Sequence, residues 1–227
     1  MTSVSSDVLT HHQLHTTSIQ AYAGSVTDSL LASLPSTERL TPAERRGIIA
    51  RYSAVLEGNF IYWMTGAYIS VGSDIARSII LENLHEEVRD CHPGMLRKFA
   101  MAAHAVPNDS DALAVYRSLS NVRLFIGRLS PVPIVVMMAF FEGFIQRFMP
   151  YLAELAQLQG SAEREYTDVH GVCDVTHTQE LFHALEAEMT LAHDSRDPVK
   201  NLFEGIDLLD RLIRDVIGKP ASPKTRQ

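Results

Sequence analysis

The sequence predicts an all-α fold, a single compact bundle of about seven helices over residues 1–218 followed by a disordered tail over 219–227. Three observations support this prediction. Apolar residues mostly recur at helical spacing, and the alternation typical of strands is scarce. At 46% hydrophobic and 21% charged residues, the chain can bury a core. The connections between predicted helices are short, and no internal repeat or long linker interrupts them.

Start and stop signals place the individual helices. Thr41, Pro42 and Glu44 form a clear helix start, with an N-cap threonine, a proline at the first helical position and an acid in the first turn. Gly160 ends the long apolar helix that begins near Pro131. The predicted helices cover about 7–33, 42–70, 74–89, 93–106, 109–128, 131–158, 162–192 and 198–217.

The charge and cysteine content exclude several classes of protein. There are 20 Lys and Arg against 27 Asp and Glu, a formal charge of −7, which argues against a nucleic-acid-binding surface. Two cysteines, at positions 91 and 173, exclude a disulfide framework and a four-thiolate zinc site.

The N-terminal segment MTSVSSDVLTHHQ is polar and has no apolar core of a signal peptide. The most apolar stretch, 131–141, is interrupted by Glu142, whereas a membrane-spanning helix needs about 20 apolar residues. We therefore expect a cytoplasmic protein that has no membrane partner.

Two glutamates lie in apolar helical surroundings. Glu142 shares a helix face with Met138, Ile145 and Met149, so it is predicted to point inward. Glu57 is likewise a single acidic residue in an apolar segment, YSAVLEGNFIYWM. An unpaired buried carboxylate costs several kcal/mol. Each glutamate therefore needs a compensating partner. Apart from a metal ion, the simplest explanations are a salt bridge to a nearby arginine, Arg147 or Arg51, or a position at the rim of the core.

A second candidate is the run His170-Gly-Val-Cys-Asp174-Val-Thr-His177. Intervals of four and seven residues place all three side chains within about 40° on one helix face. Two imidazoles and one carboxylate on a stripe are a good site for a first-row transition metal.

The segment LENLHEEVRDCHP, residues 81–93, offers further candidate ligands: Glu82, His85, Glu86, Glu87, Asp90 and His92. Helices that each contribute a carboxylate or a histidine, two of them in apolar surroundings, are typical of a carboxylate-bridged dimetal centre. Oxygen-rich ligation with a few imidazoles suits iron or manganese better than zinc.

The stretch RSIILENLHEEVRDCHPGMLRKFA, together with the closing His170, Asp174 and His177, resembles the signature of haem-oxygenase-like diiron oxidases and oxygenases. The resemblance covers about residues 45–190 and implies the haem-oxygenase-like fold. It also implies two Fe(II) ions per chain and O₂ as co-substrate. The iron ligands implied are Glu57, Glu87, His92, Glu142, His170, Asp174 and His177. Asp90 is the alternative to His92, since some members place the imidazole three residues after the second glutamate.

Members of this family oxidise small metabolites, so the resemblance implies an O₂-activating enzyme on a small amine- or amino-acid-like substrate. N-oxygenation and oxidative C–C cleavage, in a biosynthetic pathway, are the expected reactions. An external electron donor is compatible with this chemistry, and the apolar stripe of the last helix is typical of internal packing or of a homodimer contact. Arg117, Arg123 and Arg128 are candidates for a clamp on a substrate carboxylate, although ordinary surface arginines are the simpler interpretation.

Two alternative interpretations stay open. Glu82 with His85 and Glu180 with His183 are two Glu-x-x-His pairs. With Glu57 and Glu142 they would give the ligand order of a ferritin-like diiron protein. The other alternative is a non-catalytic helical binding module that has kept the fold without a working centre.

Overall fold

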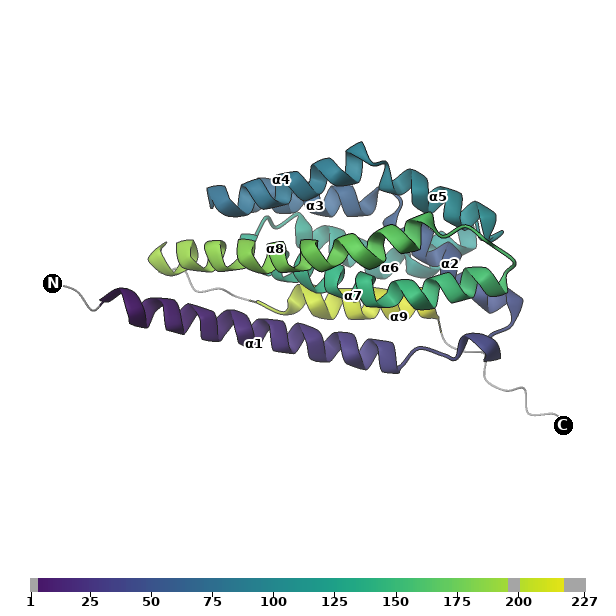
Figure 1. Cartoon of the computed structure of the whole chain (residues 1–227), viewed down its shortest axis with the longest axis horizontal. Coiled ribbons are helices and arrows are strands. Elements are labelled where there is room, and N and C mark those ends of the chain that lie inside the picture. The colour runs from purple at the N-terminus through teal and green to yellow at the C-terminus, as the bar shows by residue number, and fades with distance from the viewer. Residues whose placement is uncertain (1–3, 196–200, 219–227) are drawn as a thin grey trace.

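The computed structural model describes residues 4–195 and 201–218, and every regular element in these ranges is a helix (Figure 1). The elements are α1 Val4–Ala32, the 3₁₀ helix η1 Thr37–Arg39, α2 Pro42–Leu56, α3 Asn59–Ser70, α4 Asp74–Arg89, α5 His92–Ala102, α6 Asp109–Ile126, α7 Pro131–Leu158, α8 Glu165–Ser195 and α9 Glu204–Ile217. The prediction of an all-α fold is confirmed. The predicted tail over 219–227 lies outside the described residues.

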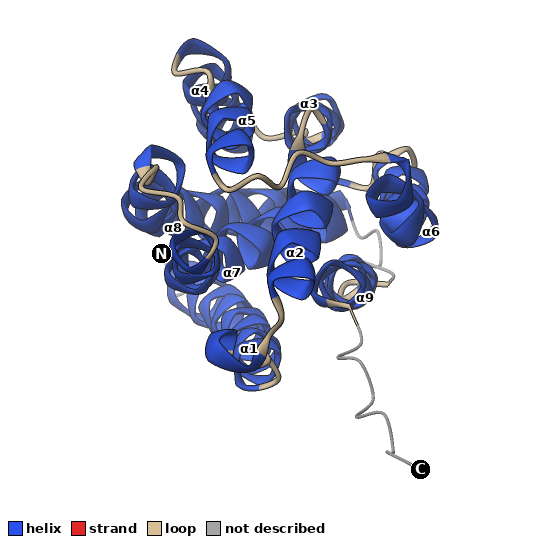
Figure 2. Ribbon diagram, turned by 90° about the vertical axis from the view of Figure 1, so that its right-hand side faces the viewer, coloured by secondary structure: helices blue, strands red, loops and turns tan. Residues whose placement is uncertain are grey.

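Helix α7 is the central element of the bundle. It packs most extensively against α8 and also contacts α1, α2, α3 and α9, which surround it in the view along the bundle (Figure 2). Its N-terminal half is apolar on all sides, and nearly every side chain from Val132 to Ile145 is buried. A helix that is hydrophobic all round needs neighbours on all sides. This position explains why a carboxylate at Glu142 lies deep in the molecule.

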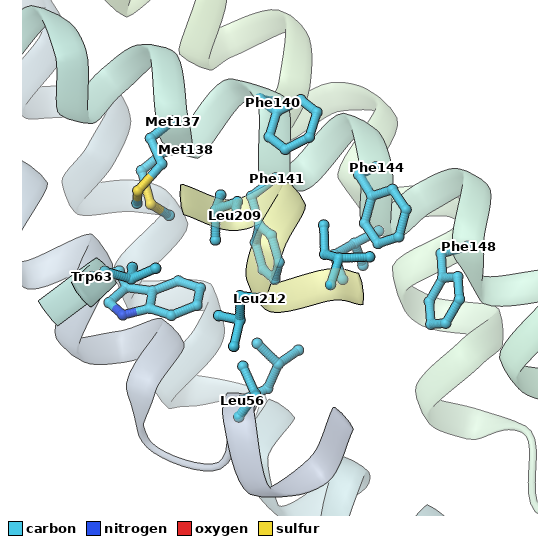
Figure 3. Packing of buried hydrophobic residues seen from close by; sticks show 14 of the residues in the cluster. Leu56, Trp63, Met137, Met138, Phe140, Phe141, Phe144, Phe148, Leu209 and Leu212 are labelled. Atoms are coloured by element: carbon cyan, nitrogen blue, oxygen red, sulfur yellow. The ribbon is translucent and has the colours of Figure 1, made fainter. Parts of the chain in front are cut away.

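By length and composition α7 could also cross a membrane. However, 83% of its most apolar window is buried inside the bundle, which is the burial of a core helix. Figure 3 shows this core, with Phe140, Phe141, Phe144 and Phe148 following one another along α7. The apolar stripe of α9, including Leu209 and Leu212, is also buried, so packing within the chain accounts for it.

The predicted single helix over 42–70 is wrong at its middle. Helix α2 ends at Leu56, and α3 begins at Asn59. Between them Gly58 has a φ of 81°, a left-handed conformation that glycine adopts without a Cβ penalty. The break leaves Glu57 at the C-cap of α2, outside the helical period of α3. Elsewhere the predicted start of α2 is confirmed, because Thr41 and Glu44 form a capping box.

A buried carboxylate of α8 accepts hydrogen bonds from the start of α4. Glu188 is 2% exposed and accepts hydrogen bonds from the backbone N–H groups of Gly72 (3.3 Å) and Ser73 (2.6 Å). These groups lie at the N-terminus of α4, where a negative charge is favoured. The contact sets the position of α8 relative to α4, the two helices that carry most of the candidate ligands.

Glu188→Ala is therefore expected to destabilise the protein by about 1–3 kcal/mol, because the N–H groups of Gly72 and Ser73 lose their hydrogen bonds to a buried carboxylate. Chemical denaturation measures the change. Glu186→Ala is the matched control, since Glu186 is a half-exposed acid on the same helix that pairs with the exposed His183. Equal effects of the two substitutions would contradict the role given to Glu188.

Candidate metal centre

The predicted inward stripe of α8 is confirmed. His170, Asp174 and His177 are 6%, 1% and 4% exposed, whereas Val172 between them is 75% exposed. The helical period alone explains this, since residues four and seven apart share one face. The His170 ring is further fixed by its Nδ1–H, which donates to the backbone carbonyl of Tyr166 at 2.8 Å. This bond leaves the lone pair of Nε2 facing the interior.

The corner between α4 and α5 brings Glu87 and His92 together. Cys91, which precedes α5, has a φ of 56°, a left-handed conformation that costs a non-glycine residue about 1 kcal/mol. The corner turns the chain so that His92 Nδ1 lies 2.6 Å from Glu87 Oε1. Both side chains are buried, at 4% and 5% exposure. Backbone strain of this kind is typical of functional sites.

One group of donor atoms comes from Glu87, His92 and His170. The Nε2 atom of His170 lies 4.0 Å from Glu87 Oε1, the oxygen that also meets His92. These three donors lie within 4.8 Å of one another. Two ligands bound to one ion at roughly 2.1 Å can be up to about 4.2 Å apart, so small adjustments would let the group hold one metal ion.

A second group surrounds His177. Its Nδ1 atom lies 3.9 Å from Asp174 Oδ1 and 4.0 Å from Glu142 Oε1. Its other nitrogen, Nε2, donates to Glu86 Oε2 at 2.9 Å, which leaves Nδ1 free to face the two carboxylates. Glu86 thus orients His177 in the way that carboxylates beside metal-bound histidines do.

The three carboxylates of this cluster pair with no lysine or arginine in the part of the chain that the structure describes. In the described residues, their ion-pair contacts are with histidines alone. Arg147, a sequence candidate for pairing with Glu142, instead pairs with Asp28 at 2.7 Å. One oxygen of Asp174, Oδ2, is buried without a hydrogen-bond partner. Such a cluster is costly unless it is protonated or neutralised by a cation.

The carboxyl pKa values reflect this environment. Burial, followed by the nearby charges of Asp174 and Glu87, raises the pKa of Glu142 well above its ordinary value. Burial likewise raises the pKa of Asp174 to about 7. Without a metal ion, the cluster therefore retains protons that exposed carboxyl groups would release.

The two histidines of the first group differ in the direction of their pKa shifts. Burial lowers the pKa of His170 to about 4, so this imidazole is neutral at pH 7 and its Nε2 can bind a metal. Burial also acts to lower the pKa of His92, but the hydrogen bond to Glu87 and the charge of that carboxylate raise it overall. A metal ion at this position would replace the His92–Glu87 hydrogen bond.

The residues of the cluster fit a transition-metal site. They supply carboxylate oxygens and imidazole nitrogens, the donor set that suits iron or manganese. The unpartnered Asp174 Oδ2 is a free buried acceptor at the place where a cation would bind. Of the seven ligands predicted from the sequence, the structure gathers Glu87, His92, Glu142, His170, Asp174 and His177.

Glu57 is not brought to this cluster. It follows the last residue of α2, its side chain is 35% exposed, and its carboxylate accepts a hydrogen bond from Arg97 Nε at 2.9 Å. The break at Gly58 is the physical reason, since it interrupts the helical period on which the inward prediction rested. Glu57 as an iron ligand stays a prediction that would require this corner to rearrange.

The residues of the ferritin-like alternative lie elsewhere. Glu82, His85 and His183 are exposed, and Glu180 is only partly buried. Asp90, the alternative to His92, is also exposed and pairs with Arg89. The buried cluster uses the neighbouring residues Glu87, His92 and His177 instead.

Cys173 lies beside the cluster. Its Sγ donates to Asp174 Oδ1 at 3.1 Å, and its donor atom lies within 4.8 Å of those of Asp174 and His177. Burial, followed by the charge of Asp174, raises the pKa of the Cys173 thiol. The Cys173 thiol is therefore a neutral hydrogen-bond donor to Asp174. In the sequence, only its position next to Asp174 indicates this role.

Comparison with known proteins agrees with the chemistry of this cluster. A family model described as "iron-containing redox enzyme" matches residues 49–209. The search of curated proteins and the search of solved structures gave no match. The matched region contains every member of the buried cluster. The chain thus belongs to the iron-containing redox enzyme family and is an iron-dependent oxidoreductase with an all-α, haem-oxygenase-like fold.

Proposed function

We propose that the protein is a non-haem diiron oxidase or oxygenase that activates O₂ to oxidise a small amine- or amino-acid-like metabolite. The observation that carries this proposal is the cluster of three buried carboxylates and three buried histidines, in two adjacent groups, which pairs with no lysine or arginine in the described residues. Glu87, His92 and His170 would hold one iron. Asp174, His177 and Glu142 would hold the other.

Bound iron would supply the one-electron chemistry with O₂ that amino-acid side chains lack. The protein's own residues prepare the site for it. Three carboxylates offset the charge of the cations, Tyr166 fixes the tautomer of His170, and Glu86 fixes that of His177. Apolar side chains of α7 lie around the cluster and lower the local dielectric constant, which strengthens these electrostatic interactions.

The test is an anaerobic Fe(II) titration of the metal-free protein, followed by admission of O₂. We expect about two irons per chain and a transient visible absorption band after O₂ is added. His170→Ala should lose at least one iron. His183→Ala is the matched control, because His183 is an exposed histidine on the same helix and should bind iron like the wild type.

Two outcomes would contradict the proposal. Only trace iron in the wild type would favour the non-catalytic binding module. Loss of iron in His183→Ala, with full binding in His170→Ala, would instead favour the ferritin-like ligand set.

Glu86→Gln tests how His177 is oriented. The substitution keeps the shape of the side chain but removes the negative charge that accepts the Nε2–H of His177. We expect iron affinity to fall by about 10- to 100-fold while two irons still bind at saturation. Glu82→Gln, an exposed acid on the same helix, is the control and should leave the affinity unchanged. An unchanged affinity in Glu86→Gln would contradict this role.

A further inference from the structure

A sulfur atom lies beside the second group of donor atoms. Cys173 stands on α8 one residue before Asp174 and four before His177, so one helical turn separates its side chain from the His177 imidazole. The donor atoms of these three residues all lie within 4.8 Å of one another. Helical geometry thus brings a thiol, a carboxylate and an imidazole together at one place on α8.

The distances within this group suit ligands of a single ion. Cys173 Sγ lies 3.1 Å from Asp174 Oδ1. Two ligands at right angles on one ion, with sulfur at about 2.3 Å and oxygen at about 2.1 Å from the metal, are also about 3.1 Å apart. His177 Nδ1 lies 3.9 Å from the same Oδ1 atom, within the roughly 4.2 Å that two ligands of one ion can span. The sulfur is therefore as well placed as the imidazole to bind an ion in this group.

The carboxylates beside this sulfur point to a cation independently of the thiol. Asp174 is 1% exposed, and its Oδ2 atom is buried without a hydrogen-bond partner. On the α7 side, the buried Glu142 brings its Oε1 atom to 4.0 Å from His177 Nδ1. Two buried carboxylates at this separation are costly unless a cation or a proton neutralises them. The Cys173 thiol therefore borders a site whose own chemistry favours a cation.

A bound cation would change the protonation state of the thiol. In the metal-free protein, burial and the charge of Asp174 raise the pKa of Cys173, so the thiol keeps its proton. A thiol that coordinates a metal ion is instead deprotonated outright. The S–H bond breaks as the sulfur–metal bond forms, and the proton passes to solvent, because the Cys173 side chain is only partly buried. Neither the sulfur nor the metal changes its oxidation state in this step.

We propose that Cys173 binds, as a thiolate, the same metal ion that Asp174 and His177 hold. This inference rests on the proposed function and deepens it, because it makes the two metal sites chemically different. The ion of the first group has only oxygen and nitrogen ligands from the protein. A thiolate donates more electron density than these ligands, so the ion bound to Cys173 is the more easily oxidised of the two.

The test is a titration of the metal-free protein with Co(II), followed by absorption spectroscopy. A thiolate is a soft, electron-rich ligand, and its bond to Co(II) absorbs strongly in the near ultraviolet, whereas bonds to carboxylates and imidazoles do not. We expect a band whose amplitude corresponds to one thiolate–metal bond per chain. Cys91→Ser is the matched control, because Cys91 is the other cysteine of the chain, is exposed, and should not contribute to the band.

Two substitutions of Cys173 separate a ligand from a hydrogen-bond donor. Cys173→Ser keeps a donor to Asp174 but supplies no thiolate, whereas Cys173→Ala removes both. A sulfur ligand predicts that both variants lose the band and bind the ion at least about 10- to 100-fold more weakly, which is the loss expected for a residue that only supports a ligand. If Cys173→Ser binds the ion like the wild type and only Cys173→Ala is impaired, the proposal is overturned.

Alkylation gives a second readout, in which the two interpretations predict opposite signs. In the Cys91→Ser variant, Cys173 is the only cysteine. A metal-bound sulfur is protected, so Co(II) should slow the reaction of Cys173 with iodoacetamide by at least about tenfold. A cation that binds nearby without contacting the sulfur would instead lower the pKa of the thiol and accelerate the reaction. Acceleration would therefore overturn the proposal.

Metal content measured on the same samples separates this inference from the proposed function. Two bound ions without a thiolate band would overturn the sulfur ligand and leave the diiron proposal standing. One bound ion with the band would support Cys173 as a ligand and overturn the second metal site of the proposed function. A protein that binds no metal would overturn both.

Discussion

Replacing Asp174 with asparagine is expected to weaken iron binding at the His177 group by at least ~100-fold and to abolish O₂ uptake. Asp174 is the most buried of the candidate ligands, at 1% exposure, and its Oδ2 has no other partner in the described structure. The substitution keeps the volume of the side chain and removes only the charge. Iron analysis and anaerobic titration would measure the loss, and Asp168→Asn, an exposed acid on the same helix, is the control.

The same variant should be more stable than the wild type when no metal is bound. At pH 8 the wild-type Asp174 is a buried carboxylate without a basic partner, and asparagine removes the cost of that charge, on the order of 1–3 kcal/mol. Iron binding and metal-free stability thus change in opposite directions. Full iron binding in a folded Asp174→Asn variant would contradict a ligand role for Asp174.

The α8 stripe could be predicted from the sequence because it depends only on helical geometry. Residues 170, 174 and 177 share a face in any regular helix, and α8 is regular from Glu165 to Ser195. The inward position of Glu142 was predictable for the same reason, since its apolar neighbours in α7 leave it no exposed face. Both predictions needed no knowledge of how the helices pack.

Candidate ligands at helix ends were harder to place from the sequence. Glu57 was placed by a helical period that Gly58 interrupts, and a single glycine within an apolar run is a weak signal for a break. The pairing of Glu87 with His92 depends on the left-handed conformation of Cys91, which the sequence does not reveal because cysteine rarely adopts it. The choice among the six candidates in residues 81–93 therefore required the structure.

The apolar contact between α2, α7 and α9 could not be predicted from the sequence. Each residue at this contact belongs to an ordinary apolar stripe. A sequence pattern shows that such residues are buried, but not whether they close completely over one another. The expectation of an amine- or amino-acid-like substrate came from the family resemblance and stays a prediction. Of the arginines considered for a carboxylate clamp, Arg123 donates to Asn59 and Arg128 pairs with Glu204.

The stability of the metal-free protein is expected to fall as the pH rises from about 6 to about 8, on the order of a few kcal/mol. Burial raises the pKa of Asp174 from 3.8 to about 7 and also raises that of Glu142 well above its ordinary value. The folded state therefore binds protons that the unfolded state has released. Such groups stabilise the fold fully below their unfolded pKa, and this contribution is lost as the pH rises through the folded pKa.

The lowered pKa of His170 changes the stability of the metal-free protein in the opposite direction, but only at lower pH. Burial lowers its pKa from 6.5 to about 4, so it contributes stability that appears as the pH rises from 4 toward 6.5 and is complete above that value. Between pH 4 and 6.5 the histidine therefore offsets about one of the two carboxyl groups, so the decline is shallow. Above pH 6.5 this offset ends, and the decline becomes steeper until the pH passes the pKa values of the folded state.

Bound iron should reverse this dependence. A metal ion takes the place of the protons on Glu142 and Asp174, and metal affinity rises with pH because the ligands must be deprotonated. Denaturation of the metal-free and the Fe(II)-loaded protein at pH 6, 7 and 8 should thus give curves that diverge, and Asp174→Asn should flatten the metal-free curve. Parallel curves for the two forms would show that the buried carboxyl groups are not where iron binds.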